Sequence, residues 1–286
     1  MSASSASPVG LVTGANTGIG EVAARELAAR GLRVVLACRS LEKAEEARKR
    51  ILSQVPGAHI SLHALDLSSL ASVRESAERF LASGSPLAVL VNNAGMAGAR
   101  GLTADGFELA FGVNHLGPHL FTRLLEPRLR AHGEGARIVN VASRAHRRVA
   151  RLDWAALQRP TRSVTGFPEY SVSKLCNVLS SREHARRLEG TGVRTYALHP
   201  GVVASDVWRK VPWPLRPLVK LRMISNEEGA RTTVYCATSP EIAAESGLYY
   251  DRCAVTPTEG LGGDDALGRE LWARCEAWAG LSVTAR

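Results

Sequence analysis

The chain has 286 residues, of which 45% are hydrophobic and 22% charged, an ordinary globular composition that excludes a disordered or fibrous protein. Lysine and arginine outnumber the acidic residues by 36 to 27, and the resulting net charge of +9 predicts a basic surface. No apolar run approaches the roughly 20 residues of a membrane span, and the polar N-terminus lacks the pattern of a secretory signal, so we expect a cytoplasmic protein.

Short apolar runs alternate with helical segments along the chain. We expect strands at 9–13, 33–38, 59–65, 87–92, 137–142, 193–198 and 247–250, helices at 18–30, 42–52 and 69–81, and longer helical stretches before the strands at 137 and 193. The strands are apolar on both faces, which is typical of buried parallel strands. The alternation predicts an α/β fold, in which residues 1–286 form a single Rossmann-type domain whose doubly wound parallel sheet has helices on both faces.

The segment 206–226 interrupts this alternation. Its three prolines predict a bent excursion, and it mixes apolar side chains such as Trp208 and Trp213 with basic ones. Its apolar side chains favour a hydrophobic substrate. The same composition suits a membrane surface, so peripheral membrane contact remains an alternative.

A glycine-rich turn, TGANTGIG at 13–20, joins the first strand to the first helix. Glycines let the backbone turn sharply and approach a pyrophosphate, and a helix N-terminus offers free N–H groups and a partial positive charge. The turn therefore predicts a dinucleotide site. We assign its contacts to Gly14, Asn16, Thr17, Gly18, Ile19 and Gly20.

The residue that meets the adenosine ribose is expected about 20 residues beyond this turn. An acidic residue there would suit the free hydroxyl of NAD, whereas this chain has Arg39 at the end of the second strand. A guanidinium can pair with a 2′-phosphate and stack on adenine, so Arg39 favours NADP(H). The alternative is that Arg39 is an ordinary surface residue.

Tyr170 and Lys174 lie four residues apart at the start of a helical stretch, which places both side chains on one helix face. A phenol has an ordinary pKa of about 10, too high for ready proton exchange at neutral pH. We expect the Lys174 ammonium to lower the pKa of Tyr170 and make it a proton donor and acceptor.

The chain resembles the short-chain dehydrogenase/reductase superfamily. The motifs that carry the resemblance are TGANTGIG, Asp66-Leu67, NNAG at 92–95, Asn114, Ser143, YSVSK at 170–174 and HPGVV at 199–203. The LACRS run and the long gap between Ser143 and Tyr170 are most similar to the retinol-dehydrogenase-like branch, which favours NADP(H). The resemblance implies an oxidoreductase that transfers a hydride between NADP(H) and an apolar aldehyde, ketone or alcohol. A catalytically silent NADP(H)-binding regulator is the alternative; it would lack a member of the catalytic Asn, Ser, Tyr and Lys set, and all four are present here.

The resemblance also implies that the segment 206–226 is the substrate lid, and it implies roles for individual residues. Ser143 would donate a hydrogen bond to the substrate oxygen, Tyr170 would transfer the proton, and Lys174 would bind the nicotinamide ribose. Asn114 would hold a proton-relay water. Further cofactor contacts would come from Asp66, Leu67, Asn93, Ala94, Gly95, Pro200, Gly201 and Val203, besides Tyr170 and Lys174. The helices that contain Asn114 and Tyr170 would form the interface of a homo-oligomer.

Pro118 has no N–H to donate to the carbonyl of Asn114, so we expect a kink and a free carbonyl that either serves the relay or is incidental. His115 and His119 are spaced like metal ligands, but no third ligand is evident and the five cysteines are scattered, so we expect no metal. The basic run from Arg144 to Arg162 is either a solvated face or a surface that attracts a polyanionic cofactor or an acidic substrate. No recognition motif supports nucleic-acid binding.

Overall fold

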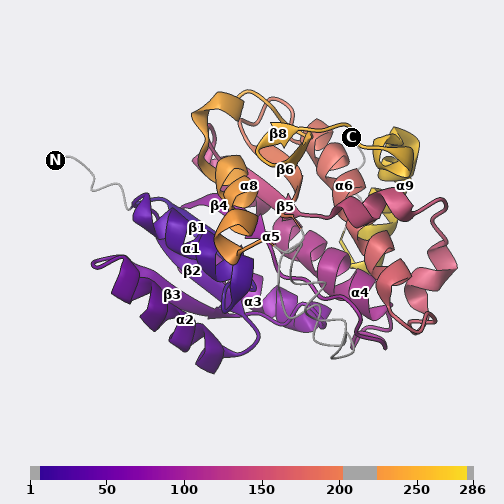
Figure 1. The fold of residues 1–286 in the computed structure, drawn as a ribbon, viewed down its shortest axis with the longest axis horizontal. Helices are drawn as coiled ribbons and strands as arrows, with labels where there is room; N and C mark the ends of the chain where they lie inside the picture. Colours follow the sequence, from indigo (N-terminus) through magenta and orange to yellow (C-terminus); the bar gives the residue numbers. More distant parts are fainter. Residues whose placement is uncertain (1–6, 202–223, 282–286) are drawn as a thin grey trace.

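The computed structural model describes residues 7–201 and 224–281 (Figure 1). Its strands form a single sheet in the order β3-β2-β1-β4-β5-β6-β7-β8. The strands are β1 (Val9–Thr13), β2 (Arg33–Cys38), β3 (Ile60–Ala64), β4 (Leu87–Asn92), β5 (Arg137–Val141), β6 (Arg194–His199), β7 (Tyr249–Asp251) and β8 (Ala254–Val255). Neighbouring strands from β3 to β7 pair in parallel, and β8 is antiparallel to β7.

Helices connect the strands and cover both faces of the sheet. The α-helices are α1 (Gly18–Ala29), α2 (Leu41–Gln54), α3 (Leu70–Ala82), α4 (Leu109–Phe111), α5 (Gly117–His132), α6 (Phe167–Arg187), α8 (Asn226–Thr238) and α9 (Asp265–Trp278). A π-helical turn, η1 (Gly112–Leu116), precedes α5, and the 3-10 helices are η2 (Arg144–Arg148), η3 (Trp154–Gln158), η6 (Pro240–Ile242) and η7 (Gly260–Gly263). The predicted α/β doubly wound fold is therefore confirmed.

The alternation of side chains along each strand creates a hydrophobic core on each face. In β1, Leu11 belongs to the cluster that contains Phe121 of α5 and Leu175 of α6. The next residue, Val12, belongs to the opposite cluster, which contains Leu27 of α1. Because both faces are covered there, the central strands β1, β2 and β4 are buried and apolar along most of their length, as the sequence indicated.

The C-terminal helix α9 packs against α5 and α6, on the face of the sheet that carries the first of these clusters. Leu271, Trp272 and Cys275 of α9 are buried there. The expected self-association would use the helices that contain Asn114 and Tyr170. Helix α9 therefore covers part of the α5 and α6 surface that this self-association would use.

Two differences from the expected elements have local causes. The last expected strand, 247–250, is β7, and β8 was not expected because its two residues are exposed and form no apolar run. The expected lid lies outside the described residues except for 224–226, where the Ser225 hydroxyl accepts a hydrogen bond from Glu228 N at 3.1 Å and caps α8. Within the described ranges, no helix combines the length and apolarity needed to cross a membrane.

Candidate active site

The strand order reverses between β1 and β4, and ligands of open parallel sheets bind in the crevice at such a point, outside the carboxyl ends of the strands. Thr13 joins the two strand ends here. Its hydroxyl accepts hydrogen bonds from the backbone N–H groups of Asn93 and Ala94, both at 3.0 Å. The Asn93 amide donates in return to the carbonyl of Thr13 at 3.0 Å. The predicted glycine turn and the NNAG motif are thus brought together.

Glycine is required at two positions of this turn. Gly14 has a φ of +64°, and an added Cβ would lie 2.9 Å from the Cα of Ala94. An added Cβ at Gly20 would lie 2.4 Å from Asn93 Nδ2 and 2.5 Å from the carbonyl oxygen of Gly14. Side chains at either position would push the turn away from the β4 loop.

The N-terminus of α1 has the free donors that an anion needs. Its N-cap residue, Thr17, is exposed and its side chain accepts no capping hydrogen bond. An added Cβ at Gly18 would meet nothing closer than Asn226 Oδ1 at 3.7 Å. Uncapped N–H groups at the end of a 12-residue helix fit the pyrophosphate of a dinucleotide.

The predicted adenosine contacts lie at the ends of the neighbouring strands. Arg39 is exposed and directly follows β2. Asp66 follows β3, and its carboxylate accepts hydrogen bonds from the N–H and hydroxyl of Ser68 at 2.9 and 2.7 Å. Leu67 is buried. Arg39 and Asp66 therefore stand on adjacent strands on the side of β1 where the adenosine half is expected.

Ser143, Tyr170 and Lys174 meet beyond the end of β5. Ser143 is the N-cap of η2, where its hydroxyl accepts from Ala145 N at 3.2 Å, and the hydroxyl lies close enough to the Tyr170 phenol to act on that phenol's pKa. The Lys174 ammonium donates to the carbonyl of Val141 at 2.8 Å and lies 5.7 Å from the centroid of the Tyr170 ring. The three predicted residues thus lie together, with Gly95 beside Lys174, since an added Cβ on Gly95 would be 3.3 Å from Nζ.

The electrostatics of this group differ from the sequence prediction. Burial lowers the pKa of Lys174 to about 8. Burial also raises the pKa of Tyr170, and the hydrogen bond with Ser143 offsets only part of that effect. The expected lowering of the Tyr170 pKa by Lys174 is therefore not found for the protein alone, because desolvation of the phenol dominates.

Asn114 lies in the π-helical turn η1, where Gly117 N donates to Gly112 O across five residues. Its side-chain amide bonds to both backbone groups of Met96, at 2.8 and 2.9 Å, and to Ser173 Oγ at 2.9 Å. These bonds use both N–H groups of the amide and one acceptor position of its oxygen, and we expect a relay water to bind the backbone carbonyl. Pro118 stands in the first turn of α5, directly after this π turn.

Of the other predicted cofactor residues, Pro200 and Gly201 follow β6, and Val203 lies outside the described residues. Gly201 has a φ of +92°, and Ile224 covers the position of an added Cβ at 2.3 Å. The Pro-Gly turn therefore packs directly against the residues that lead into α8.

The histidines considered as metal ligands, and arginines of the basic run, interact with other side chains of the protein. His115 Nδ1 is 2.9 Å from Asn177 Oδ1, and His119 Nε2 is 3.1 Å from Glu276 Oε1. Among the described residues, no three His, Cys, Asp or Glu side chains could hold a metal ion. In the basic run, Arg144 pairs with Asp251 at 2.5 Å and Arg147 with Glu259 at 2.9 Å.

Sequence reasoning missed two contacts that stabilise the glycine turn, one from the Thr13 hydroxyl and one from Arg50. Arg50 of α2 pairs with Glu21 of α1 at 2.7 Å, and its Nη2 donates to the carbonyl of Asn16 at 3.3 Å. The only signal was that Thr13 ends a buried strand, where a polar side chain needs a partner. For Arg50, the charge pattern of α2 is that of any solvated helix face.

Comparisons with known proteins agree with this geometry. A model of the short chain dehydrogenase family matches residues 8–213. Retinol dehydrogenase 12 from Homo sapiens is 44% identical over 269 residues, which cover 92% of this chain and 83% of that protein. An uncharacterized protein from Mycobacterium paratuberculosis has a solved structure with a TM-score of 0.79 and 31% identity, covering 98% of this chain and 96% of that one. A metagenomic short-chain oxidoreductase in complex with NADP has a TM-score of 0.59 and 26% identity, covering 82% and 92%.

Proposed function

This chain belongs to the short-chain dehydrogenase/reductase family, in its retinol-dehydrogenase-like branch, and we propose that it transfers a hydride between NADP(H) and an apolar aldehyde, ketone or alcohol. Oxidoreductase activity on alcohol or carbonyl groups follows from the family. The finer proposal depends on one observation. Ser143, Tyr170 and Lys174 meet beside a glycine turn that leads into an uncapped helix N-terminus.

The residues have complementary parts in this reaction. When bound, the nicotinamide supplies or accepts the hydride. Ser143 can donate a hydrogen bond to the substrate oxygen, where charge develops. Tyr170 keeps its proton at neutral pH because its pKa is raised, so it can donate that proton to a carbonyl oxygen. Lys174, Gly95 and Asn114 lie together at the place where the nicotinamide ribose would be held.

The preference for NADP(H) depends on Arg39. Its exposed guanidinium follows β2, where a 2′-phosphate would sit, and one of the similar solved structures contains NADP. Arg39→Ala should raise the Kd for NADPH about tenfold or more and leave the Kd for NADH nearly unchanged. The control is Arg30→Ala, since Arg30 is an exposed arginine at the far end of α1 that pairs with Glu26. An equal loss for NADPH and NADH in Arg39→Ala would contradict the preference.

The apolar substrate is inferred from the side chains of the segment 206–226 and from the relative that is a retinol dehydrogenase. A panel of bulky apolar and small polar carbonyls, followed by the absorbance of NADPH, tests it. We expect kcat/KM to be highest for the apolar compounds. Faster turnover of the small polar carbonyls would overturn this part of the proposal.

The same assay with Tyr170→Phe tests the chemistry. We expect activity to fall by at least about a hundredfold, because the proton donor is removed while the ring remains. Tyr235→Phe is the matched control, since Tyr235 lies on α8 and its hydroxyl bonds to Glu241. Unchanged activity in Tyr170→Phe would refute the assignment. A wild type that binds NADPH but turns over no compound would instead favour the silent regulator.

A further inference from the structure

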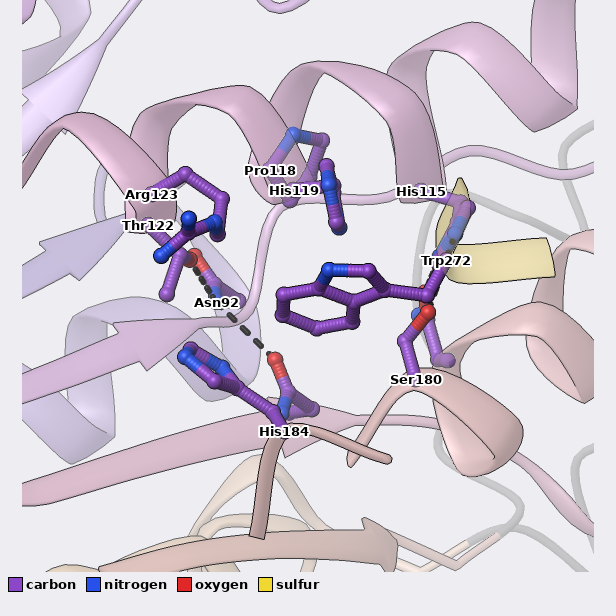
Figure 2. Close-up of a pocket in the computed structure, with 11 residues that line it drawn as sticks. Asn92, His115, Pro118, His119, Thr122, Arg123, Ser180, His184 and Trp272 are labelled. Atoms are coloured by element: carbon purple, nitrogen blue, oxygen red, sulfur yellow. Dashed lines mark hydrogen bonds between the residues drawn. The ribbon is translucent and has the colours of Figure 1, made fainter. Parts of the chain in front are cut away.

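A small polar cavity of about 30 Å³ lies behind the candidate active site, between α5, α6 and α9 (Figure 2). Its walls include His115 and Thr122 from the helical segment after Asn114, Asn177 from α6, and Trp272 from α9. This volume can hold about two water molecules, and its polar walls offer them partners. No step of the proposed reaction uses this cavity.

A chain of hydrogen bonds joins the cavity wall to the Lys174 site. Asn177 Nδ2 donates to the carbonyl of Val141 at 3.4 Å, and this is the same carbonyl that receives Lys174 Nζ at 2.8 Å. The Asn177 carbonyl oxygen is 2.9 Å from His115 Nδ1. Ser180 Oγ, at 3.4 Å from His115 Nε2, continues the chain.

The donor and acceptor roles along this series of hydrogen bonds follow from its first bond, between Asn177 and Val141. The Val141 oxygen only accepts, so Asn177 must turn its NH₂ group toward Val141 and its oxygen toward His115. His115 then donates from Nδ1, and its Nε2 is the acceptor that faces the Ser180 hydroxyl at 3.4 Å and the Cys275 thiol at 3.5 Å. Burial lowers the pKa of His115 to about 3, so the ring is neutral at ordinary pH values, and the Asn177 oxygen beside Nδ1 selects the tautomer.

Asn177 also separates Lys174 from the cavity. It occupies the second position on the Val141 carbonyl, so the ammonium is restricted to the side that faces Gly95 and Asn114. We propose that Asn177, held in place by His115, is a positioning residue that directs Lys174 toward the cofactor side and keeps cavity water away from its ammonium. This inference takes the role of Lys174 from the proposed function, and Asn177 acts on the cofactor only through Lys174.

The titration of Lys174 reports this role without any turnover. The other titratable groups around it are Tyr170, whose pKa burial raises, and His115, whose pKa burial lowers; behind His115, burial raises the pKa of Cys275. Burial in the protein lowers the pKa of Lys174 itself to about 8. Water admitted to the ammonium would move that pKa back toward its ordinary value of 10.5.

The experiment is a pH titration of protein labelled with ¹³C at lysine Cε, in which the Lys174 signal is assigned by its loss in Lys174→Met. We expect Asn177→Ala to raise the pKa of Lys174 by about one unit or more, and to raise the Kd for NADPH several-fold. Thr122→Ala is the control, because it enlarges the same cavity from α5 without touching Val141. Asn177→Ser provides the same test with a smaller loss of packing if Asn177→Ala does not fold.

The same Lys174 pKa in Asn177→Ala and wild type would overturn the proposal, as would an equal rise in Thr122→Ala. These results are independent of the proposed function. Failure of that function would appear as a wild type without turnover of any carbonyl or alcohol, whatever the lysine titration shows.

Discussion

Glu276 fixes the C-terminal helix α9 to the core, and its contribution can be worked out from its contacts. The carboxylate is 4% exposed and accepts hydrogen bonds from His119 Nε2 at 3.1 Å and Arg123 Nε at 2.9 Å. Burial raises the pKa of Glu276, but these two donors outweigh it and lower the pKa from 4.5 to about 2. At ~1.4 kcal/mol per unit, the net shift corresponds to a stabilisation of about 3 kcal/mol.

Glu276→Gln keeps the shape of the side chain and removes its charge. We expect the free energy of unfolding at pH 7.5 to fall by about 2–3 kcal/mol, measured by urea denaturation followed by circular dichroism. Glu270→Gln is the control, because Glu270 on the same helix forms an exposed pair with Arg274 and should change stability by at most about 0.5 kcal/mol.

The pH dependence of this difference has a definite sign. The folded-state pKa of Glu276 is depressed, so its stabilisation is complete above pH 4.5 and is lost as the pH falls toward 2. The difference between wild type and Glu276→Gln should therefore be constant from pH 8 to about 5 and shrink below that. A Glu276→Gln protein as stable as wild type at pH 7.5 would refute the reasoning.

Three other changes have outcomes that the structure dictates. Gly20→Ala should abolish NADPH binding measured by fluorescence, because its Cβ would collide with Asn93 Nδ2, whereas Gly268→Ala on α9, with its nearest neighbour at 3.5 Å, should not. Lys174→Met should be inactive, yet its free energy of unfolding in urea at pH 7 should exceed that of wild type by up to about 3 kcal/mol, because burying the Lys174 ammonium destabilises the folded protein. This difference should disappear as the pH rises toward 10.5, where the lysine is neutral in both the folded and the unfolded state. Acidification from pH 7.5 to 5 should lower wild-type stability and lower it less in His115→Asn, because unfolding exposes a histidine that takes up a proton below its ordinary pKa of 6.5.

The parts of the site that could be predicted are those set by neighbours in the sequence. The turn from Gly14 to Gly20 joins a strand to the next helix, so its glycines predict a phosphate-binding geometry directly. Tyr170 and Lys174 share a helix face because helical spacing fixes their relation. Most strand bounds follow for the same reason, since each buried parallel strand is a local apolar run.

The parts that could not be predicted join segments far apart in the sequence. The carbonyl that binds Lys174 belongs to Val141, 33 residues away, and the partner of Asn177 is His115, 62 residues away. Nothing in the local pattern of α9 indicates that Trp272 is buried against α5 and α6. Such partners depend on how the helices pack around the sheet, which a single sequence does not encode in its spacing.

Tyr170 and Lys174 show why charge alone was a poor guide to the chemistry. A neighbouring ammonium was expected to lower the pKa of the phenol, but burial raises the pKa of Tyr170 and lowers that of Lys174, so both groups shift toward their neutral forms. The phenol therefore holds its proton at neutral pH, which suits it to protonate a carbonyl oxygen. Removing a proton from an alcohol requires the opposite state, and the Val141 carbonyl draws the Lys174 ammonium away from supplying it. Alcohol oxidation therefore needs further positive charge beside the phenol to stabilise the phenolate. In the protein alone, an ultraviolet titration should find no ionisation of Tyr170 below its ordinary pKa of 10.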